Sequence, residues 1–128
     1  MAVYLLDTSV IIDALNRKRG RWELLRGLAE GGDGLACSVV TLTEIYAGAR
    51  LHEMEATEAF LQSLEHFEVD AKLARSAGLL KNEWAKLGHT LSVPDVLIAA
   101  TALLHGLVLV TDNRKDFPMT ELVFCPLS

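Results

Sequence analysis

The sequence is poor in the residues that mark several familiar classes of protein. It has only two cysteines, Cys37 and Cys125, which lie far apart in apolar stretches, so neither a disulfide framework nor a zinc site is expected. We expect two buried thiols in a reducing compartment. The longest apolar stretch, residues 96–110, contains polar interruptions and is shorter than the roughly 20 residues that span a bilayer. Because the first residues also lack a basic signal-peptide region, we predict a cytoplasmic protein with no membrane partner.

An excess of basic charge is also lacking, which bears on nucleic-acid binding. The net charge is −5, whereas nucleic-acid-binding domains are commonly basic. Five of the 17 acids are the candidate site residues Asp7, Glu44, Asp95, Asp112 and Asp116, and without them the acids would equal the 12 lysines and arginines. If those five acids surround bound cations, the net charge does not exclude a polyanionic partner.

What the sequence does contain is an alternation of short apolar strands with amphipathic helices. Its 128 residues suit one domain, residues 1–128, and a hydrophobic fraction of 51% suffices for a core. Wholly apolar strands that alternate with helices predict a parallel sheet covered on both faces. The expected class is α/β, with three α/β/α layers and about four to five short central strands. The strands are expected at 3–6, 35–37, 66–69, 107–110 and 122–124, and the helices at 10–15, 21–29, 41–50, 55–64, 71–87 and 92–105.

Four acidic residues follow the expected strands at equivalent places. Asp7 directly follows the first strand, and Glu44 lies near the start of the helix after the second. Asp95 lies in the first turn of a later helix, and Asp112 follows the next strand. The carboxyl ends of parallel strands meet at one edge of the sheet, so these acids are expected to converge there. Oxygen ligands suit Mg²⁺ or Mn²⁺, which can activate water for attack on a phosphodiester.

Each of these acids also has a purely structural explanation. Residues 41–44 (TLTE) and 92–95 (SVPD) both match the capping box, in which the acid reaches back to the first amide of a helix. Asp7 could simply cap the first helix, and Asp112 with Asn113 could form an ordinary turn. Taken together, the four positions favour a functional cluster, because chance does not readily place an acid after every central strand. The sequence has no catalytic triad, Cys–His pair or phosphate-binding GxxxxGK motif as an alternative.

Four motifs in order give the chain a specific resemblance. They are residues 6–13 (LDTSVIID), 38–48 (SVVTLTEIYAG), 92–99 (SVPDVLIA) and 110–117 (VTDNRKDF). With these motifs the chain resembles the PIN-domain nucleases, and specifically the VapC toxins of bacterial and archaeal toxin–antitoxin pairs. The resemblance covers nearly the whole length and implies a single PIN-like nuclease domain.

The resemblance assigns expected roles to particular residues. It implies that Asp7, Glu44, Asp95 and Asp112 bind Mg²⁺ or Mn²⁺ as the catalytic acids. Members of the family cleave RNA, often tRNA or ribosomal RNA, and typically form homodimers. They are silenced by a cognate antitoxin whose tail enters the active-site groove. Polar support for the metal-binding acids is expected from Thr8 and Thr111.

The fourth acid is ambiguous within the resemblance. Some family members place it at the position of Asp112 and others at that of Asp116, and this sequence has both. We rank Asp112 first because it is nearer the end of its strand, and we treat Asp116 as an auxiliary ligand or a water-positioning acid. Asn113 could contact the site, although formation of a turn is the favoured role.

Two further features concern partners. The basic segment of residues 17–21 is either a track for the RNA backbone or a solvated loop between two helices, and both interpretations stay open. Its candidate RNA-binding side chains are Arg17, Lys18, Arg19 and Arg21. A group of apolar side chains lies remote from the acids and predicts a large exposed patch that forms a homodimer interface. The alternative is that they complete the monomer's own core. They are Leu51, Met54, Phe60, Leu61 and Leu64.

The leading hypothesis is therefore a metal-dependent endoribonuclease of the toxin class. A housekeeping RNA-processing or structure-specific nuclease would use the same acids, but the short chain leaves no appended domain for targeting. A non-catalytic interaction module is disfavoured because all the acids are present.

Overall fold

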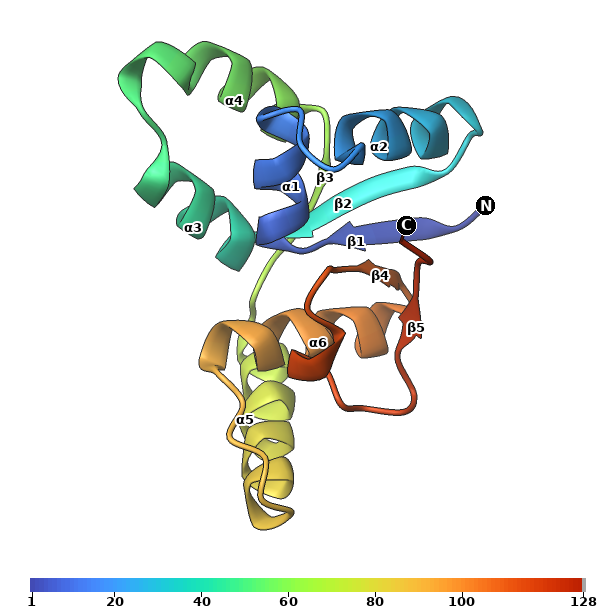
Figure 1. Ribbon diagram of the computed structural model, residues 1–128. Helices are drawn as coiled ribbons and strands as arrows, with labels where there is room; N and C mark the ends of the chain where they lie inside the picture. The colour runs from blue at the N-terminus through green and yellow to red at the C-terminus, as the bar shows by residue number, and fades with distance from the viewer. Residues whose placement is uncertain (128) are drawn as a thin grey trace.

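A five-stranded parallel sheet forms the centre of the computed structural model, which describes residues 1–127 (Figure 1). The strand order is β3-β2-β1-β4-β5, and every neighbouring pair is parallel. The predicted α/β class and the predicted parallel sheet are confirmed. The strands are β1 (Val3–Leu6), β2 (Gly34–Ser38), β3 (Glu65–Phe67), β4 (Val108–Val110) and β5 (Val123–Phe124).

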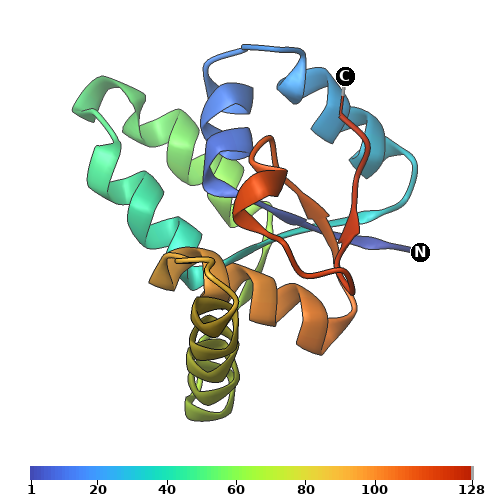
Figure 2. The ribbon, with the colours of Figure 1, turned by 60° about the horizontal axis from the view of Figure 1, so that its bottom comes forward.

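Helices cover both faces of this sheet. Figure 1 shows α1 and α2 on one side and α5 and α6 on the other, and α5 extends away from the sheet, as Figure 2 also shows. None of the helices within residues 1–127 is long and apolar enough to cross a membrane. The helices are α1 (Thr8–Leu15), α2 (Arg21–Glu30), α3 (Val39–Gly48), α4 (Met54–Gln62), α5 (Ala71–Lys86) and α6 (Val93–His105), with short 3₁₀ turns η1 (Leu51–Glu53) and η2 (Arg114–Asp116).

The central strands are apolar on both faces because both faces are covered. Successive strand residues point to opposite sides, so Leu5 packs in the core beneath α5 and α6, whereas Leu6 packs in the core beneath α1 and α2. In β4, Leu109 packs on the same side as Leu5, and Val110 packs on the same side as Leu6. All four side chains are fully buried. This arrangement explains why the strands have no alternation of polar and apolar residues.

The strand order places a topological switch point between β1 and β4. From β1 the chain proceeds outward to β2 and β3, and it then returns to lay β4 against the opposite side of β1. In open parallel sheets, the crevice beyond the carboxyl ends of the strands at such a point is where ligands bind. The backbone amide of Asp7, just after β1, donates to the carbonyl of Val110 at the end of β4 over 2.9 Å.

Side-chain caps fix where the helices that surround this edge begin. Asp7 caps α1, and Ser92 caps α6 by accepting a hydrogen bond from the amide of Asp95 at 3.2 Å. The helix expected to open at Thr41 begins at Val39 instead, because Ser38 is its cap and accepts from the amide of Val40. The capping-box explanation for residues 41–44 is therefore wrong.

The apolar patch expected at a dimer interface is largely part of the monomer's own core. Leu61 is 1% exposed and Leu64 is 6% exposed, and both pack in the core formed with α1 and α2. Phe60 is half-buried against Trp22, with ring centroids 6.1 Å apart. Leu51 alone of the five is strongly exposed, at 93%. Assigning Leu61 and Leu64 to an exposed patch was wrong, because Leu61 lies on the inner face of α4 and Leu64, just before β3, packs into the same core. Cys37 and Cys125 are free and buried, as expected.

Replacing Leu61 tests this placement. Leu61→Ala should lower the free energy of unfolding by about 2–5 kcal/mol, since truncating a buried leucine leaves a cavity. The matched variant Leu51→Ala should change it by less than about 0.5 kcal/mol. Urea denaturation monitored by circular dichroism would measure both, and equal midpoints for the two variants would contradict the core assignment.

Candidate active site

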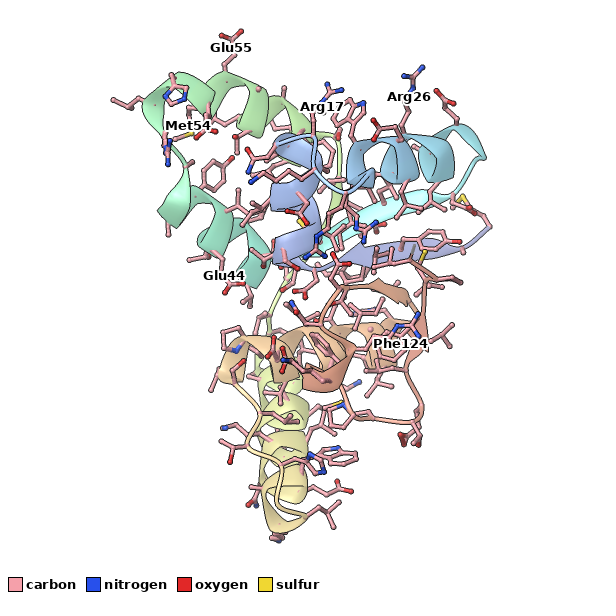
Figure 3. The ribbon with its side chains drawn as sticks, in the orientation of Figure 1. Arg17, Arg26, Glu44, Met54, Glu55 and Phe124 are labelled. Carbon is pink, nitrogen blue, oxygen red and sulfur yellow. The ribbon has the colours of Figure 1, made fainter. Side chains whose placement is uncertain are left out.

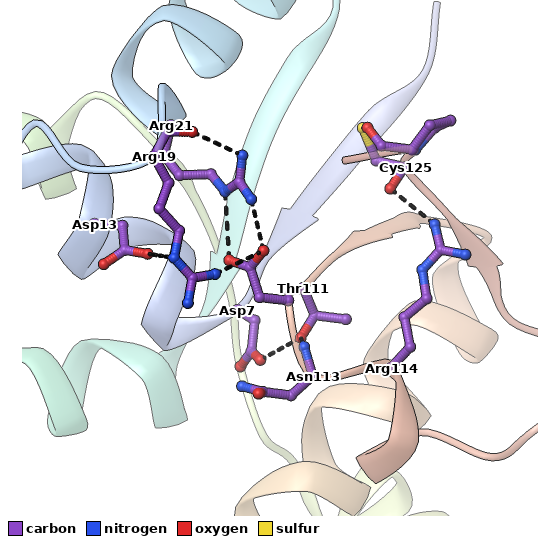
Figure 4. Close-up of polar contacts among 10 residues, drawn as sticks. Asp7, Asp13, Arg19, Arg21, Thr111, Asn113, Arg114 and Cys125 are labelled. Carbon is purple, nitrogen blue, oxygen red and sulfur yellow. Dashed lines mark hydrogen bonds and ion pairs between the residues drawn. The ribbon is translucent and has the colours of Figure 1, made fainter. Parts of the chain in front are cut away.

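Asp7 is the most tightly held acid of the site. It is 7% exposed and lies between the end of β1 and the start of α1. Its Oδ1 accepts from the amide of Thr8 at 2.9 Å, and its Oδ2 accepts from the hydroxyl of Thr111 at 2.7 Å (Figure 4). The Thr111 hydroxyl also accepts from the amide of Asn113 at 3.0 Å. Thr111 therefore couples the loop after β4 to the Asp7 carboxylate, and Asp7 is both a helix cap and a member of the site.

Glu44 reaches the site from α3 through a different contact. Its side chain is exposed, as Figure 3 shows on that helix, and its Oε1 accepts from the Thr8 hydroxyl at 2.7 Å. The same Thr8 oxygen lies 3.3 Å from the hydroxyl of buried Thr41. Thr8 thus connects the first turn of α1 to α3, so that Glu44 faces the residue next to Asp7.

Two acids of the site, Asp7 and Asp95, respond to the charge of neighbouring carboxylates. Burial raises the pKa of Asp7 above its ordinary value, hydrogen bonds from Thr111 and Thr8 oppose this, and the charges of Glu44 and Asp116 raise it further. Burial also raises the pKa of Asp95, as do the charges of Asp7, Asp116 and Glu44, against a hydrogen bond with Ser92. Three of the predicted acids, together with Asp116, therefore form one group of mutually repelling carboxylates, hereafter the acid cluster.

This cluster is open in the present arrangement of side chains. Within residues 1–127, no three His, Cys, Asp or Glu side chains lie close enough together to hold a metal ion as placed. Asp7 is buried, Asp95 and Asp116 are half-buried, and Glu44 is exposed. The donors are all carboxylates, which is the chemistry that hard divalent cations prefer.

Asp112, the acid that we ranked first for the fourth position, is paired with two arginines. Its Oδ1 lies 2.6 Å from Nη2 of Arg21, its Oδ2 accepts from Nε of the same residue at 3.3 Å, and Nη1 of Arg19 lies 3.3 Å from Oδ1 (Figure 4). The hydrogen bond from Arg21 holds the pKa of Asp112 below its ordinary value, despite partial burial. Asp112 is not among the main charges that raise the pKa of Asp7 or Asp95.

The buried Arg21 is the feature that sequence reasoning missed. It is 3% exposed, although we expected either a phosphate-tracking or a solvated side chain. A signal was present, because Arg21 begins α2 and a cation at a helix N-terminus is unfavourable. Such a cation implies a nearby anion, and Asp112 provides it from 91 residues away.

The remaining basic residues of segment 17–21 have separate environments. The guanidinium of Arg17 lies 4.0 Å from the centre of the Trp22 ring, and Nε of Arg19 lies 3.6 Å from Asp13. Lys18 is exposed. Arg17 and Arg19 both have positive φ, at 56° and 55°. Trp22 thus packs against a cation and Phe60, not in the acid cluster.

The sequence is similar to those of known proteins over nearly its whole length. A sequence model of the PIN domain matches residues 4–120. The chain is 33% identical over 115 residues to Ribonuclease VapC19 of Mycobacterium tuberculosis, covering 90% of this chain and 92% of that protein. It is 29% identical over 126 residues to the tRNA(fMet)-specific endonuclease VapC of Shigella flexneri, with 91% of each covered.

Solved structures give the same result. A chain of VapBC2 from Rickettsia felis, bound to a DNA fragment from its promoter, superposes with a TM-score of 0.85 at 26% identity, over 98% of this chain and 99% of that chain. A toxin–antitoxin complex from Klebsiella pneumoniae gives 0.78 at 30% identity, over 94% and 95%. The protein therefore belongs to the PIN domain family, and within that family to the VapC ribonucleases.

Proposed function

We propose that this protein is a metal-dependent endoribonuclease, the toxin of a toxin–antitoxin pair, and that the acid cluster is its active site. The observation that carries the proposal is the convergence of Asp7, Glu44, Asp95 and Asp116 at the switch point between β1 and β4. Relatives that are a ribonuclease and a tRNA(fMet)-specific endonuclease support RNA as the substrate. A tRNA or a ribosomal RNA is the proposed substrate.

A divalent cation fits the chemistry of these donors. The charges of Glu44 and Asp116 help to raise the pKa of Asp7 and of Asp95, and a bound cation would relieve that repulsion. Mg²⁺ and Mn²⁺ bind carboxylate oxygens while keeping several waters, and we propose either ion for this cluster. Such a cation supplies charge neutralisation at the phosphate and lowers the pKa of a bound water.

The protein's own residues hold the donors in place. Thr111 and the amide of Thr8 orient Asp7, so its carboxylate loses little freedom when a ligand binds. The Thr8 hydroxyl orients Glu44, which is otherwise exposed. Asp95 lies in the first turn of α6, where the helix dipole favours a negative charge and an anionic substrate. We propose Thr8 and Thr111 as positioning residues, and Asn113 as a turn residue that supports Thr111 through its amide.

For the fourth acid we propose Asp116 in place of our first-ranked Asp112. Asp116 contributes to the repulsion that Asp7 and Asp95 experience, whereas Asp112 is engaged by Arg21 and Arg19. In this proposal Asp112 compensates a buried arginine.

Toxin function is favoured over a housekeeping nuclease by the structural neighbours, which are toxin–antitoxin complexes. We propose a cognate antitoxin as the protein partner on that basis.

A homodimer stays a prediction that no longer includes Leu61 and Leu64, because both are buried within the monomer. A cytoplasmic location likewise stays a prediction. We also propose that residues 1–128 form a single nuclease domain.

Asparagine substitutions in the acid cluster test the catalytic proposal. Asp7→Asn and Asp95→Asn should each lower RNA cleavage by at least about 100-fold, which corresponds to about 2.7 kcal/mol of transition-state stabilisation. The far-UV spectrum should stay native, because asparagine keeps a carbonyl acceptor at the helix start. Glu23→Gln, which removes an exposed acid from α2, is the matched control and should cleave normally. Normal cleavage by both asparagine variants would refute the assignment.

A second pair of variants distinguishes Asp116 from Asp112. Asp116→Asn should lower cleavage by about 100-fold, as for the other metal-binding acids. Asp112→Asn should instead lower the free energy of unfolding by about 1–3 kcal/mol, because buried Arg21 loses its charged acceptor, and should lower cleavage by no more than about tenfold. Initial rates and urea titrations give both quantities. The opposite pattern would restore Asp112 as the fourth metal-binding acid.

Metal binding should also be visible without any substrate. A cation that binds only the folded state stabilises it by about 1.4 kcal/mol at ten times its Kd. The melting temperature should therefore rise with Mg²⁺ or Mn²⁺ in wild type and in Glu23→Gln, and should respond much less in Asp95→Asn. A wild-type melting temperature unaffected by both metals across the millimolar range would argue against a cation site.

A further inference from the structure

An open cavity lies beside the acid cluster and has the opposite charge. It has a volume of about 1020 Å³ and is lined by residues 19 and 21, the segment that follows β4 and residues 126 and 127. Four of the lining side chains are cationic and only one is acidic. They are Arg19, Arg21, Arg114 and Lys115 against Asp112, with Thr111, Asn113, Pro126 and Leu127 completing the wall.

The four cations differ in how far their charge is already compensated. Arg21 is buried and bound through two atoms to Asp112, so it forms a fixed part of the wall. Arg19 keeps 61% of its side chain exposed, and its contacts to Asp13 and Asp112 are 3.6 and 3.3 Å long. Long ion pairs made by an arginine this exposed contribute little, so Arg19 can exchange them for another anion.

The cations contributed by η2 stand on the opposite wall. Arg114 is held there, because its guanidinium lies 4.8 Å from the centre of the Phe124 ring and donates to the carbonyl of Cys125 at 3.2 Å (Figure 4). Lys115 is exposed on the same turn. The cavity therefore has cationic groups on two facing segments that are far apart in sequence.

Thr111 is the boundary between the two charged regions. Its side chain lines the basic cavity, and its hydroxyl donates to Oδ2 of Asp7 at 2.7 Å. A polyanion that reaches the acid cluster must pass groups that repel it, in a protein of net charge −5. Phosphate contacts from lysine and arginine provide most of the attraction between proteins and nucleic acid strands and also fix the register of the strand.

We propose that this cavity is a backbone subsite, which binds a phosphate of the RNA strand next to the phosphodiester that is cut. The proposal rests on the proposed ribonuclease function and extends it by naming Arg19, Arg114 and Lys115 as the groups that contact that phosphate. The cavity is far larger than a single carboxylate needs, and its cations face one another across it, which suits a strand that passes through. Asp112 keeps Arg21 in the wall and limits the positive charge.

The test is binding of a fluorescent single-stranded RNA oligonucleotide in EDTA, so that cleavage does not interfere. Lys115→Gln and Arg19→Gln should each weaken binding about three- to tenfold and reduce the slope of log affinity against log salt by about 0.7, the value for one phosphate contact on a single strand. The matched control is Lys86→Gln, at the C-terminal end of α5, which extends away from the sheet (Figure 1). It should bind as wild type does.

A neutral linkage in the RNA gives a sharper readout. Each phosphate of the RNA is replaced in turn by a neutral methylphosphonate. At one position, next to the cleavage site, this replacement should weaken binding to wild type and to Lys86→Gln. The same replacement should not further weaken binding to Lys115→Gln, which already lacks the contact. Melting temperatures of all the variants should agree within a few degrees, so that a folding defect is excluded. A substitution that merely perturbs structure would not abolish the effect of one particular linkage.

The outcomes separate this proposal from the proposed function. If the cavity variants bind RNA as Lys86→Gln does, the subsite is wrong, even where wild type cleaves RNA and Asp7→Asn does not. If these variants keep RNA affinity but lose affinity for an oligoglutamate peptide, the cavity binds an acidic protein segment and the proposal is overturned. If wild type with Mg²⁺ or Mn²⁺ neither cleaves nor binds RNA, the ribonuclease assignment itself is refuted.

Discussion

Asp7 joins the two strands at the centre of the sheet, and the rest of the site is arranged around that joint. Its amide donates to the carbonyl of Val110 at 2.9 Å, and its carboxylate accepts from the Thr111 hydroxyl at 2.7 Å. The same carboxylate caps α1. One residue therefore adds a hydrogen bond beyond the β1–β4 ladder, begins a helix and carries a buried acid, so its conformation is determined by the fold and not by a flexible loop.

This joint has an electrostatic consequence. A carboxylate that is 7% exposed and lies near other acids is disfavoured in its charged form, and the pKa of Asp7 is raised accordingly. The pKa of Asp95 is raised for the same reasons. The repelling acids lie on one side of Thr111, and the cationic side chains of Arg19, Arg114 and Lys115 lie on the other. The net charge of −5 hides that separation, which matters more for an anionic strand than the total does.

The fold was predictable because its signals are local. Apolar strands followed by capped helices indicate a parallel sheet covered on both faces, and the strand at residues 3–6 and the Ser92-capped helix appear where expected. The start of α3 was misplaced because Ser38 and Thr41 are both competent caps. The exposure of Leu61 could not be predicted either, since helical periodicity identifies an apolar face without saying which surface covers it.

For the site, the sequence alone determined which residues follow the strands, and parallel strands bring such positions to one edge of the sheet. That sufficed to group Asp7, Glu44 and Asp95. Only the tertiary structure gives the ground on which we propose Asp116 over Asp112, because that choice depends on Arg21, a residue 91 positions from Asp112 that is buried at the start of α2. A carboxylate pairs with a nearby cation, because that pairing stabilises its charged form. Which cation is nearby depends on how segments that are distant in sequence pack together, and this cannot be deduced from spacing along the chain.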